Sequence, residues 1–446
     1  MTSASFDELQ EWYQNCNPDA SLSSLGKYEE WYIPLDAWKA EEGDEPVELR
    51  GPCAADDLIR HILLQKDESA QLFSGFRGSG KSTELERVAE RLGPEYAVLQ
   101  LKARSYHYLN NPLTIEELVL ILAAGVVDRA RAQLGIKTGI IDEVKTRLAD
   151  LAKKLKMPDL RIGPFQIKDL LLEGTTFREK LRRMAGERPG ELREFLFGVV
   201  IEVAAAVSPR RLVVFLDDLE KFEAEPEKLS QICLALADLF RHYADFLHPP
   251  NCHVVYTIPP YVAFRSPGIG HDYGGRIRTL FNVRIQSSPP ERTMDTAGIR
   301  ALAAFLDRRV PLNRLFGPNR EDCVKSMILA SGGHVRDVLY LMQEVISWAL
   351  KQNPYGGEQT VQLPLGPDSV VRSIKVHANR YPFLSVEMKE TLRQVSRMGS
   401  LDSIADALIP FQIQALDHFM ILNYHNHRQF FDIHPLIRER IEGDHA

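Results

Sequence analysis

The eight residues from Gly75 to Ser82 constrain the fold of this chain more than any other stretch. They read G-F-R-G-S-G-K-S and fit the pattern G-x-x-x-x-G-K-S. An apolar segment ends just before them at Phe73, and residues 82–92 carry apolar side chains at helical spacing. Glycines let a backbone approach a ligand closely, and the N–H groups at a helix N-terminus favour an anion. The stretch therefore predicts a strand, a phosphate-binding loop and a helix.

The residue types of this loop predict separate tasks. Lys81 would place its charge between the β- and γ-phosphates, and the Ser82 hydroxyl would bind Mg²⁺. ATP and Mg²⁺ are the predicted cofactors. The residues expected to contact the nucleotide are Gly75, Phe76, Arg77, Gly78, Ser79, Gly80, Lys81, Ser82 and Thr83.

Further apolar runs predict the rest of a sheet. They lie at 96–103, 210–221, 251–260 and 281–289, and a helical pattern at 226–246 separates two of them. Continuous apolar runs are typical of parallel strands covered on both faces. Strands that alternate with helices predict an α/β fold, here a doubly wound parallel sheet of the P-loop NTPase type.

Acidic residues end the run V-V-F-L-D-D. A buried strand delivers such carboxylates to the carboxyl edge of the sheet, where ligands bind in open α/β folds. We expect Asp217 to hold Mg²⁺ together with Ser82, and Asp218 to orient or deprotonate the attacking water, with Glu220 as the alternative. The alternative is that these acidic residues form a solvated turn after the strand and have no catalytic or metal-binding role.

Polar residues farther along the chain are candidates for catalysis. Thr257 ends a predicted strand and would contact the γ-phosphate or the water, unless it only bonds backbone. Arg336 follows a Gly-Gly turn in the first turn of a helix, where it would reach the nucleotide from a lid or remain on the surface. Arg276 and Arg278 precede a strand, which suits either an arginine finger for a neighbouring subunit or a solvated basic turn.

The chain divides into segments of different character. Residues 1–45 form an acidic arm with a short helix, 46–290 the ATPase core, and 291–352 a helical lid with helices at 294–309, 319–331 and 335–351. A long helical insertion occupies about 110–208 of the core, with one amphipathic helix predicted over 141–155 and a break at A-G-E-R-P-G-E. Residues 353–367 read as a linker. Residues 368–446 predict short helices and the hairpin L-N-Y-H-N-H-R-Q-F-F-D-I-H-P, together a winged-helix-like domain.

Charge is distributed unevenly along the chain. The net charge is -7, but residues 1–70 hold 16 acidic and 5 basic side chains, and residues 129–188 hold 15 basic and 8 acidic ones. Residues 368–446 are nearly neutral, with 9 basic and 10 acidic side chains. This balance argues against a surface built wholly for nucleic acid. If nucleic acid binds, the basic segment 129–188 is the better candidate.

Composition also bears on location and metals. Five scattered cysteines, a polar start and the absence of an apolar run of about 18 residues predict a cytoplasmic protein without a membrane segment. His425, His427 and His434 lack the cysteine or carboxylate spacing of a zinc site. We read them as surface residues of the hairpin.

These motifs together resemble the AAA+ and STAND group of P-loop ATPases, and most closely its origin-recognition-like branch. The resemblance covers roughly 46–446 and equates Gly75 to Ser82 with Walker A and Val213 to Asp218 with Walker B. It makes Thr257 sensor 1 and Arg336 sensor 2. Two features depart from the group: the second Walker B acid is aspartate, which implies slow or partner-dependent hydrolysis, and the insertion is unusually long.

The resemblance implies a nucleotide-driven switch ATPase that assembles with itself or with an effector protein, in bacterial defence or signalling. An initiator- or transposition-type DNA-binding ATPase is the alternative, using the winged helix or the basic insertion. A chain that binds ATP without turning it over is a third reading.

Overall fold

The computed structural model describes most of the chain. The described residues are 2–20, 22, 26–41, 43–106, 111–135, 146–147, 149–151, 153–154, 175–221, 226–351, 360–381, 384–402 and 404–443. Four positions of the predicted 141–155 helix, Ile141, Val144, Leu148 and Leu155, lie outside them, as does much of the basic segment 129–188.

The chain forms two compact units. One comprises Ala54–Gly75 and Glu84–Thr279 and is called the sheet unit below. The other comprises Met1–Cys53, Phe76–Thr83 and Leu280–Ala446, and it is called the loop unit because it includes the glycine loop. Each unit is built from segments that are distant in sequence.

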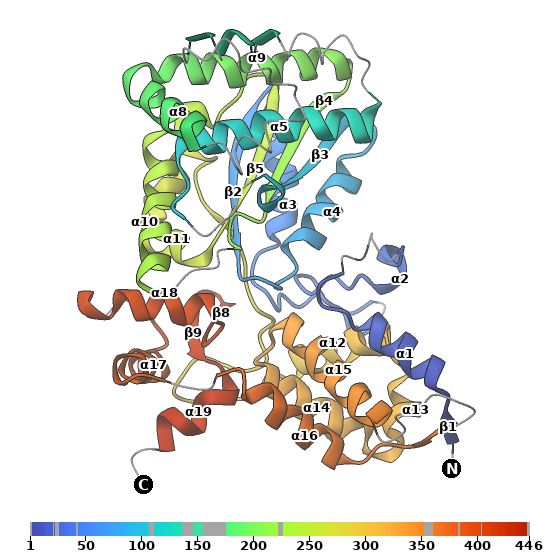
Figure 1. Ribbon diagram of the computed structural model, residues 1–446. Coiled ribbons are helices and arrows are strands. Elements are labelled where there is room, and N and C mark those ends of the chain that lie inside the picture. Colours follow the sequence, from blue (N-terminus) through green and yellow to red (C-terminus); the bar gives the residue numbers. More distant parts are fainter. Residues whose placement is uncertain are drawn as a thin grey trace. The chain divides into compact units, whose positions relative to one another are not determined.

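A five-stranded sheet forms the centre of the α/β architecture (Figure 1). Its strands are β2 (Ser69–Gly75), β3 (Tyr96–Lys102), β4 (Arg211–Asp217), β5 (Cys252–Ile258) and β6 (Arg278–Leu280). They lie in the order β3-β4-β5-β2-β6, and the pairs β3–β4, β4–β5 and β5–β2 are parallel. All of β5 and nearly all of β4 are buried. The parallel sheet predicted from apolar runs is therefore confirmed.

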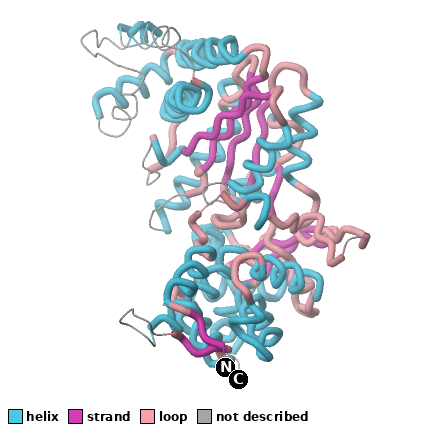
Figure 2. Tube along the Cα trace, turned by 90° about the vertical axis from the view of Figure 1, so that its right-hand side faces the viewer, coloured by secondary structure: helices cyan, strands magenta, loops and turns pink. Residues whose placement is uncertain are grey.

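Helices surround this sheet on both of its sides (Figure 2). In chain order they are α3 (Ala54–Leu64), α4 (Lys81–Leu92), α5 (Ile115–Leu134), α8 (Thr175–Glu187), α9 (Pro189–Val207), α10 (Pro226–His242) and α11 (Pro260–Arg265). Helix α5 packs on α9 and β3, and α9 also contacts β4 and β5. The long insertion is thus mostly helical where it is described, with α8 and α9 separated at the predicted break.

The loop unit is mostly helical. It contains β1 (Thr2–Ala4), α1 (Phe6–Asn15), α2 (Tyr28–Trp31), α12 (Thr296–Asp307), α13 (Leu312–Phe316), α14 (Arg320–Ser331), α15 (Val335–Lys351), β7 (Val361–Leu363) and α16 (Pro367–Ala378). Strand β1 pairs with β7 in antiparallel fashion. Buried residues of α1, α12, α14 and α15 share one hydrophobic core. The helices predicted over 294–309, 319–331 and 335–351 are present as α12, α14 and α15, and the short α13 was not predicted.

The C-terminal part contains the predicted hairpin, which a further helix follows. Its elements are α17 (Val386–Met398), α18 (Ile409–Asp417), β8 (Ile421–Asn426), β9 (Arg428–Ile433) and α19 (Pro435–Glu442). Strands β8 and β9 pair in antiparallel fashion and turn at His427, whose φ is 57°. Helix α17 packs on β9, α18 and α19.

The strand predicted over 281–289 is wrong. The actual strand, β6, ends at Leu280, and the next residues bond to three different segments instead of one neighbour. The amide groups of Asn282, Val283 and Arg284 donate to Asn423, Gly333 and Leu49 at 2.9, 3.1 and 2.8 Å. An apolar segment with such scattered partners is buried like a strand without belonging to a sheet.

Candidate functional site

The glycine loop continues directly from β2 and leads into α4, so the predicted strand, loop and helix are present. Gly78 and Gly80 have φ values of 74° and 100°, which favour glycine over any residue with a side chain. The Nζ of Lys81 donates to the carbonyl of Phe76 at 2.9 Å and is buried. Together these residues give the compact turn that a phosphate-binding loop requires.

Two donors from distant parts of the loop unit hold carbonyl groups of this loop. The Nε2 of His334, just before α15, lies 3.0 Å from the carbonyl oxygen of Arg77. The guanidinium of Arg50 donates to the carbonyl of Ser79 and, through Nε at 2.8 Å, to that of Phe281. Neither residue was singled out from the sequence.

Arg336, the predicted sensor 2, lies against the same loop. A Cβ atom placed on Gly78 would come within 2.4 Å of the Arg336 Cδ atom, so the arginine stem fills the space beside that glycine. Its guanidinium forms an ion pair with Asp19 and an Nη2 contact of 3.2 Å to the Tyr340 hydroxyl. The structure therefore brings Arg336 and the glycine loop together.

The Gly332-Gly333 turn allows α15 to start there. Both glycines have positive φ, 63° and 76°. A Cβ on Gly333 would lie 1.9 Å from the Val283 carbonyl oxygen, and the Tyr424 hydroxyl donates to the Gly332 carbonyl at 2.5 Å. The Val283 carbonyl leaves room only for glycine at position 333, and the tight turn places His334 and Arg336 beside the loop.

Three buried acids gather at the end of β4 in the sheet unit. Asp217, Asp218 and Glu220 each offer a carboxylate oxygen, and these oxygens lie within 4.8 Å of one another. Among the residues that the structure describes, no other group of histidine, cysteine or acidic side chains has this compactness. Carboxylate oxygens are ligands that Mg²⁺ prefers, so the cluster is suited to a divalent cation.

The two acids after Asp217 have different surroundings. Asp218 has a φ of 73°, and its carboxylate faces two cations, Arg104 Nε at 3.0 Å and Lys221 Nζ. Glu220 accepts a hydrogen bond of 3.0 Å from the hydroxyl of Thr257, which is fully buried on β5. The structure thus brings Thr257 to Glu220, and it engages Asp218 in ion pairs.

The two candidate finger arginines also differ. Arg276 is exposed and forms an ion pair with Asp57. Arg278 is buried, and its Nη1 donates to the carbonyls of Tyr273 and Arg276 at 3.1 Å each. Burial, with a contribution from Arg276, lowers the pKa of Arg278 to about 10. Of the pair, only Arg276 presents its charge at a surface of the sheet unit.

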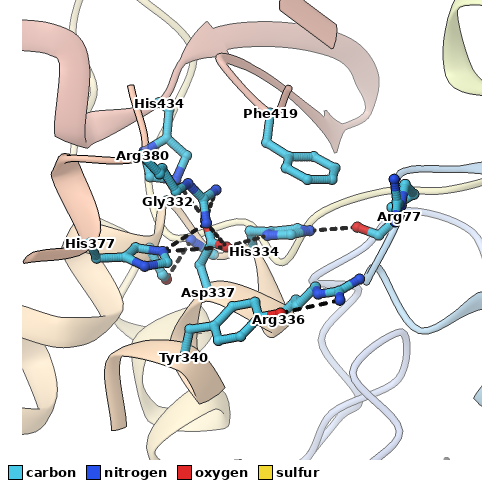
Figure 3. A network of polar contacts seen from close by, with 12 residues as sticks. Arg77, Gly332, His334, Arg336, Asp337, Tyr340, His377, Arg380, Phe419 and His434 are labelled. Carbon is cyan, nitrogen blue, oxygen red and sulfur yellow. Dashed lines mark hydrogen bonds and ion pairs between the residues drawn. The ribbon is translucent and has the colours of Figure 1, made fainter. Parts of the chain in front are cut away.

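A buried polar network surrounds Asp337 in the first turn of α15 (Figure 3). Arg380 binds its carboxylate with two nitrogens at 2.8 and 2.9 Å, and His434 Nε2 lies 2.9 Å away. His334 Nδ1 is 3.1 Å from the same carboxylate. Burial alone would raise the pKa of Asp337, but the charge and hydrogen bonds of these neighbours hold it well below its usual value.

His434 corrects the interpretation of the C-terminal histidines as surface residues. It is fully buried, donates through Nε2 to Asp337 and accepts at Nδ1 from the Leu436 amide at 3.2 Å, so it caps α19. Burial lowers its pKa to about 4 despite the nearby carboxylate. His427 is exposed at the turn, in line with the expectation.

Comparisons with known proteins find similarity to solved structures. No protein-family model matches the chain, and no curated protein matches it in sequence. Among solved structures, it is similar to the Aeropyrum pernix ORC2 protein in ADPNP–ADP complexes. The identity is 11%, the TM-score 0.36, and the match covers 93% of this chain and 97% of that chain. Within the described ranges, no helix is long and apolar enough to cross a membrane.

Proposed function

We propose that the chain is an ATP-binding and ATP-hydrolysing P-loop NTPase of the AAA+ type that acts as a nucleotide-driven switch. The observation that carries the proposal is the glycine loop between β2 and α4, with Gly78 and Gly80 in glycine-only conformations and Lys81 at the start of the helix. A strand, a loop of this sequence and a helix together are the context in which the motif binds phosphates.

In this proposal the acidic cluster serves the metal and the water. Asp217 and Ser82 would hold Mg²⁺, which would neutralise charge on the phosphates. Glu220, oriented by the Thr257 hydroxyl, would accept a proton from the attacking water. Asp218 becomes the second choice for that role, since Arg104 and Lys221 already engage its carboxylate.

Arg336 would make α15 sensitive to the γ-phosphate. It begins in contact with the loop and is bound to Asp19, so a phosphate that attracts its guanidinium would have to displace that ion pair. Such an exchange would bias the helices of the loop unit between two arrangements, which is how a nucleotide operates a switch. A second copy of the chain or an effector protein would then bind, and a role in bacterial defence or signalling rests on the resemblance alone.

Calorimetric titration with Mg-ATP tests the proposal. We expect wild-type protein to bind, and Lys81→Ala to lose affinity by at least about tenfold, because one charge-assisted contact to phosphate disappears. Lys66→Ala is the matched control, since Lys66 is exposed just before β2. Wild-type protein that binds no nucleotide would refute the proposal, as would a Lys81→Ala variant that binds normally.

The alternative, a DNA-binding ATPase, is favoured by one feature, the hairpin β8–β9 that follows α17 and α18. A winged-helix domain has this succession of helices and hairpin. The test is binding to duplex DNA over a series of salt concentrations. Binding that depends on contacts to the DNA phosphates would weaken steeply as the salt concentration rises. Weak DNA binding that does not change with salt would exclude a DNA-binding ATPase.

A further inference from the structure

We propose that His334 is a positioning residue for the phosphate loop. By binding the carbonyl group of the Arg77–Gly78 peptide, His334 presents the Gly78 amide of that peptide to the nucleotide. This inference rests on the proposed function, because it assigns a task to a residue of the ATP site. It concerns only the loop unit, in which both His334 and Arg77 lie.

The geometry of the contact fixes the direction of the hydrogen bond. The His334 Nε2 atom lies 3.0 Å from the Arg77 carbonyl oxygen. A carbonyl oxygen only accepts hydrogen bonds, so Nε2 carries the proton and donates it. The ring is fully buried and stacks on Phe419 at 4.9 Å with an interplanar angle of 26° (Figure 3). The donor is therefore held in one orientation.

The consequence for the loop follows from peptide planarity. In a trans peptide the C=O of Arg77 and the N–H of Gly78 point in opposite directions. A carbonyl bound to His334 on one side of the backbone therefore turns the Gly78 N–H to the other side. Arg50 acts on the next but one peptide in the same way, since it binds the Ser79 carbonyl and so orients the Gly80 N–H.

Two loop amides are thus oriented before any ligand arrives. Pre-oriented donors cost less to order upon binding, which raises affinity without any contact between His334 and the nucleotide. The Nδ1 atom of the same ring lies 3.1 Å from the Asp337 carboxylate, to which Arg380 and His434 also bind.

Two substitutions separate the positioning role from a general packing role. A glutamine side chain carries its NH₂ group about as far from the backbone as the histidine Nε2, whereas asparagine carries its NH₂ near the Nδ1 position. Both variants lose the stacking on Phe419, so packing effects are shared. Only His334→Gln keeps a donor for the Arg77 carbonyl.

The experiment is equilibrium binding of Mg-ATP, with thermal unfolding of the nucleotide-free proteins measured alongside. We expect His334→Asn to weaken binding about tenfold, the effect of one well-placed hydrogen bond, and His334→Gln to stay within about twofold of wild type. The two variants should unfold at similar temperatures. Equal affinity of His334→Asn and wild type would overturn the inference, and so would equal weakening in both variants. Wild-type protein that does not bind ATP would instead refute the proposed function.

Discussion

At the scale of a single residue, position 78 requires glycine for two independent reasons. Its φ of 74° disfavours any side chain, and a Cβ atom would collide with the stem of Arg336. Gly93, at the end of α4, shares the first constraint with a φ of 71° but has open space around it. A comparison of substitutions at Gly78 and Gly93 therefore separates the effect of backbone strain from the effect of the close approach of Arg336.

We expect Gly78→Ala to weaken Mg-ATP binding by at least about tenfold, because Arg336 and the loop must move apart. Gly93→Ala should leave the affinity unchanged. Strain of about 1 kcal/mol is common to both variants and should lower the free energy of unfolding similarly. Calorimetry and urea unfolding measure the two effects. If both alanine variants bind like wild type, Arg336 does not constrain the loop.

The choice between the two acids after Asp217 is also decided by single residues. Glu220 accepts from Thr257, whereas the Asp218 carboxylate lies between Arg104 and Lys221. We expect Glu220→Gln to slow phosphate release from Mg-ATP by at least about 100-fold, the usual contribution of a general base. Asp218→Asn should slow it much less. The reverse order would return the role to Asp218.

Most regular elements of the sheet unit could be predicted because their signals are local. The strands β3, β4 and β5 are apolar runs bounded by polar turns, and each was expected within four residues of its bounds. The hairpin was predictable as well, since its two short segments are adjacent in sequence. Segment 281–289 failed because apolar character reports burial and does not reveal which segments receive the backbone hydrogen bonds.

The site was predictable only where the chemistry lies in a motif. Lys81 begins α4, Asp217 ends β4 and Thr257 lies in β5, and all three belong to stretches of recognisable sequence. His334 and Arg50 contact residues of the loop that are 257 and 29 positions away in the sequence. Contacts between such distant residues produce no periodic pattern in the sequence. The one available signal for His334 was its place between the Gly-Gly turn and Arg336.

At the scale of helices and strands, the network around Asp337 makes the free energy of unfolding depend on pH. His434 joins β9 and α19 to α15 in its neutral form, with a pKa of about 4. In the unfolded chain its pKa is about 6.5, so between these values the unfolded state binds one more proton. Stability contributed by this residue is therefore present above about pH 6.5 and is lost as the pH falls toward 4.

We expect the free energy of unfolding to fall between pH 7 and pH 5, and this fall to be smaller in His434→Gln. The slope due to one such proton is about 1.4 kcal/mol per pH unit within the window. Urea unfolding at several pH values measures it. His427→Asn is the control, because His427 is exposed and asparagine tolerates its positive φ. A slope in His434→Gln as steep as in the control would contradict this account.

At the scale of the whole molecule, we propose that the chain assembles with a partner, because its charge is uneven and Arg276 is exposed. If Arg276 acts on the nucleotide of a neighbouring copy, phosphate release per chain should increase with protein concentration. Arg276→Ala should abolish this increase while ATP affinity stays the same, and Arg265→Ala, also an exposed arginine, should not. Light scattering with ATP reports the assembly itself. If the protein remains a monomer in the presence of ATP, Arg276 does not act on the nucleotide of a neighbouring copy.

The most direct test of the account concerns Asp217, because it asks whether the acidic cluster and the glycine loop act on the same nucleotide. The measurement is phosphate release from Mg-ATP in a single turnover, with wild type compared with Asp217→Asn. We predict release by wild type and a decrease of at least about 100-fold in the variant, with binding of ATP retained. Equal rates in the two proteins, or no release by wild type, would contradict the central claim that this chain hydrolyses ATP with these residues.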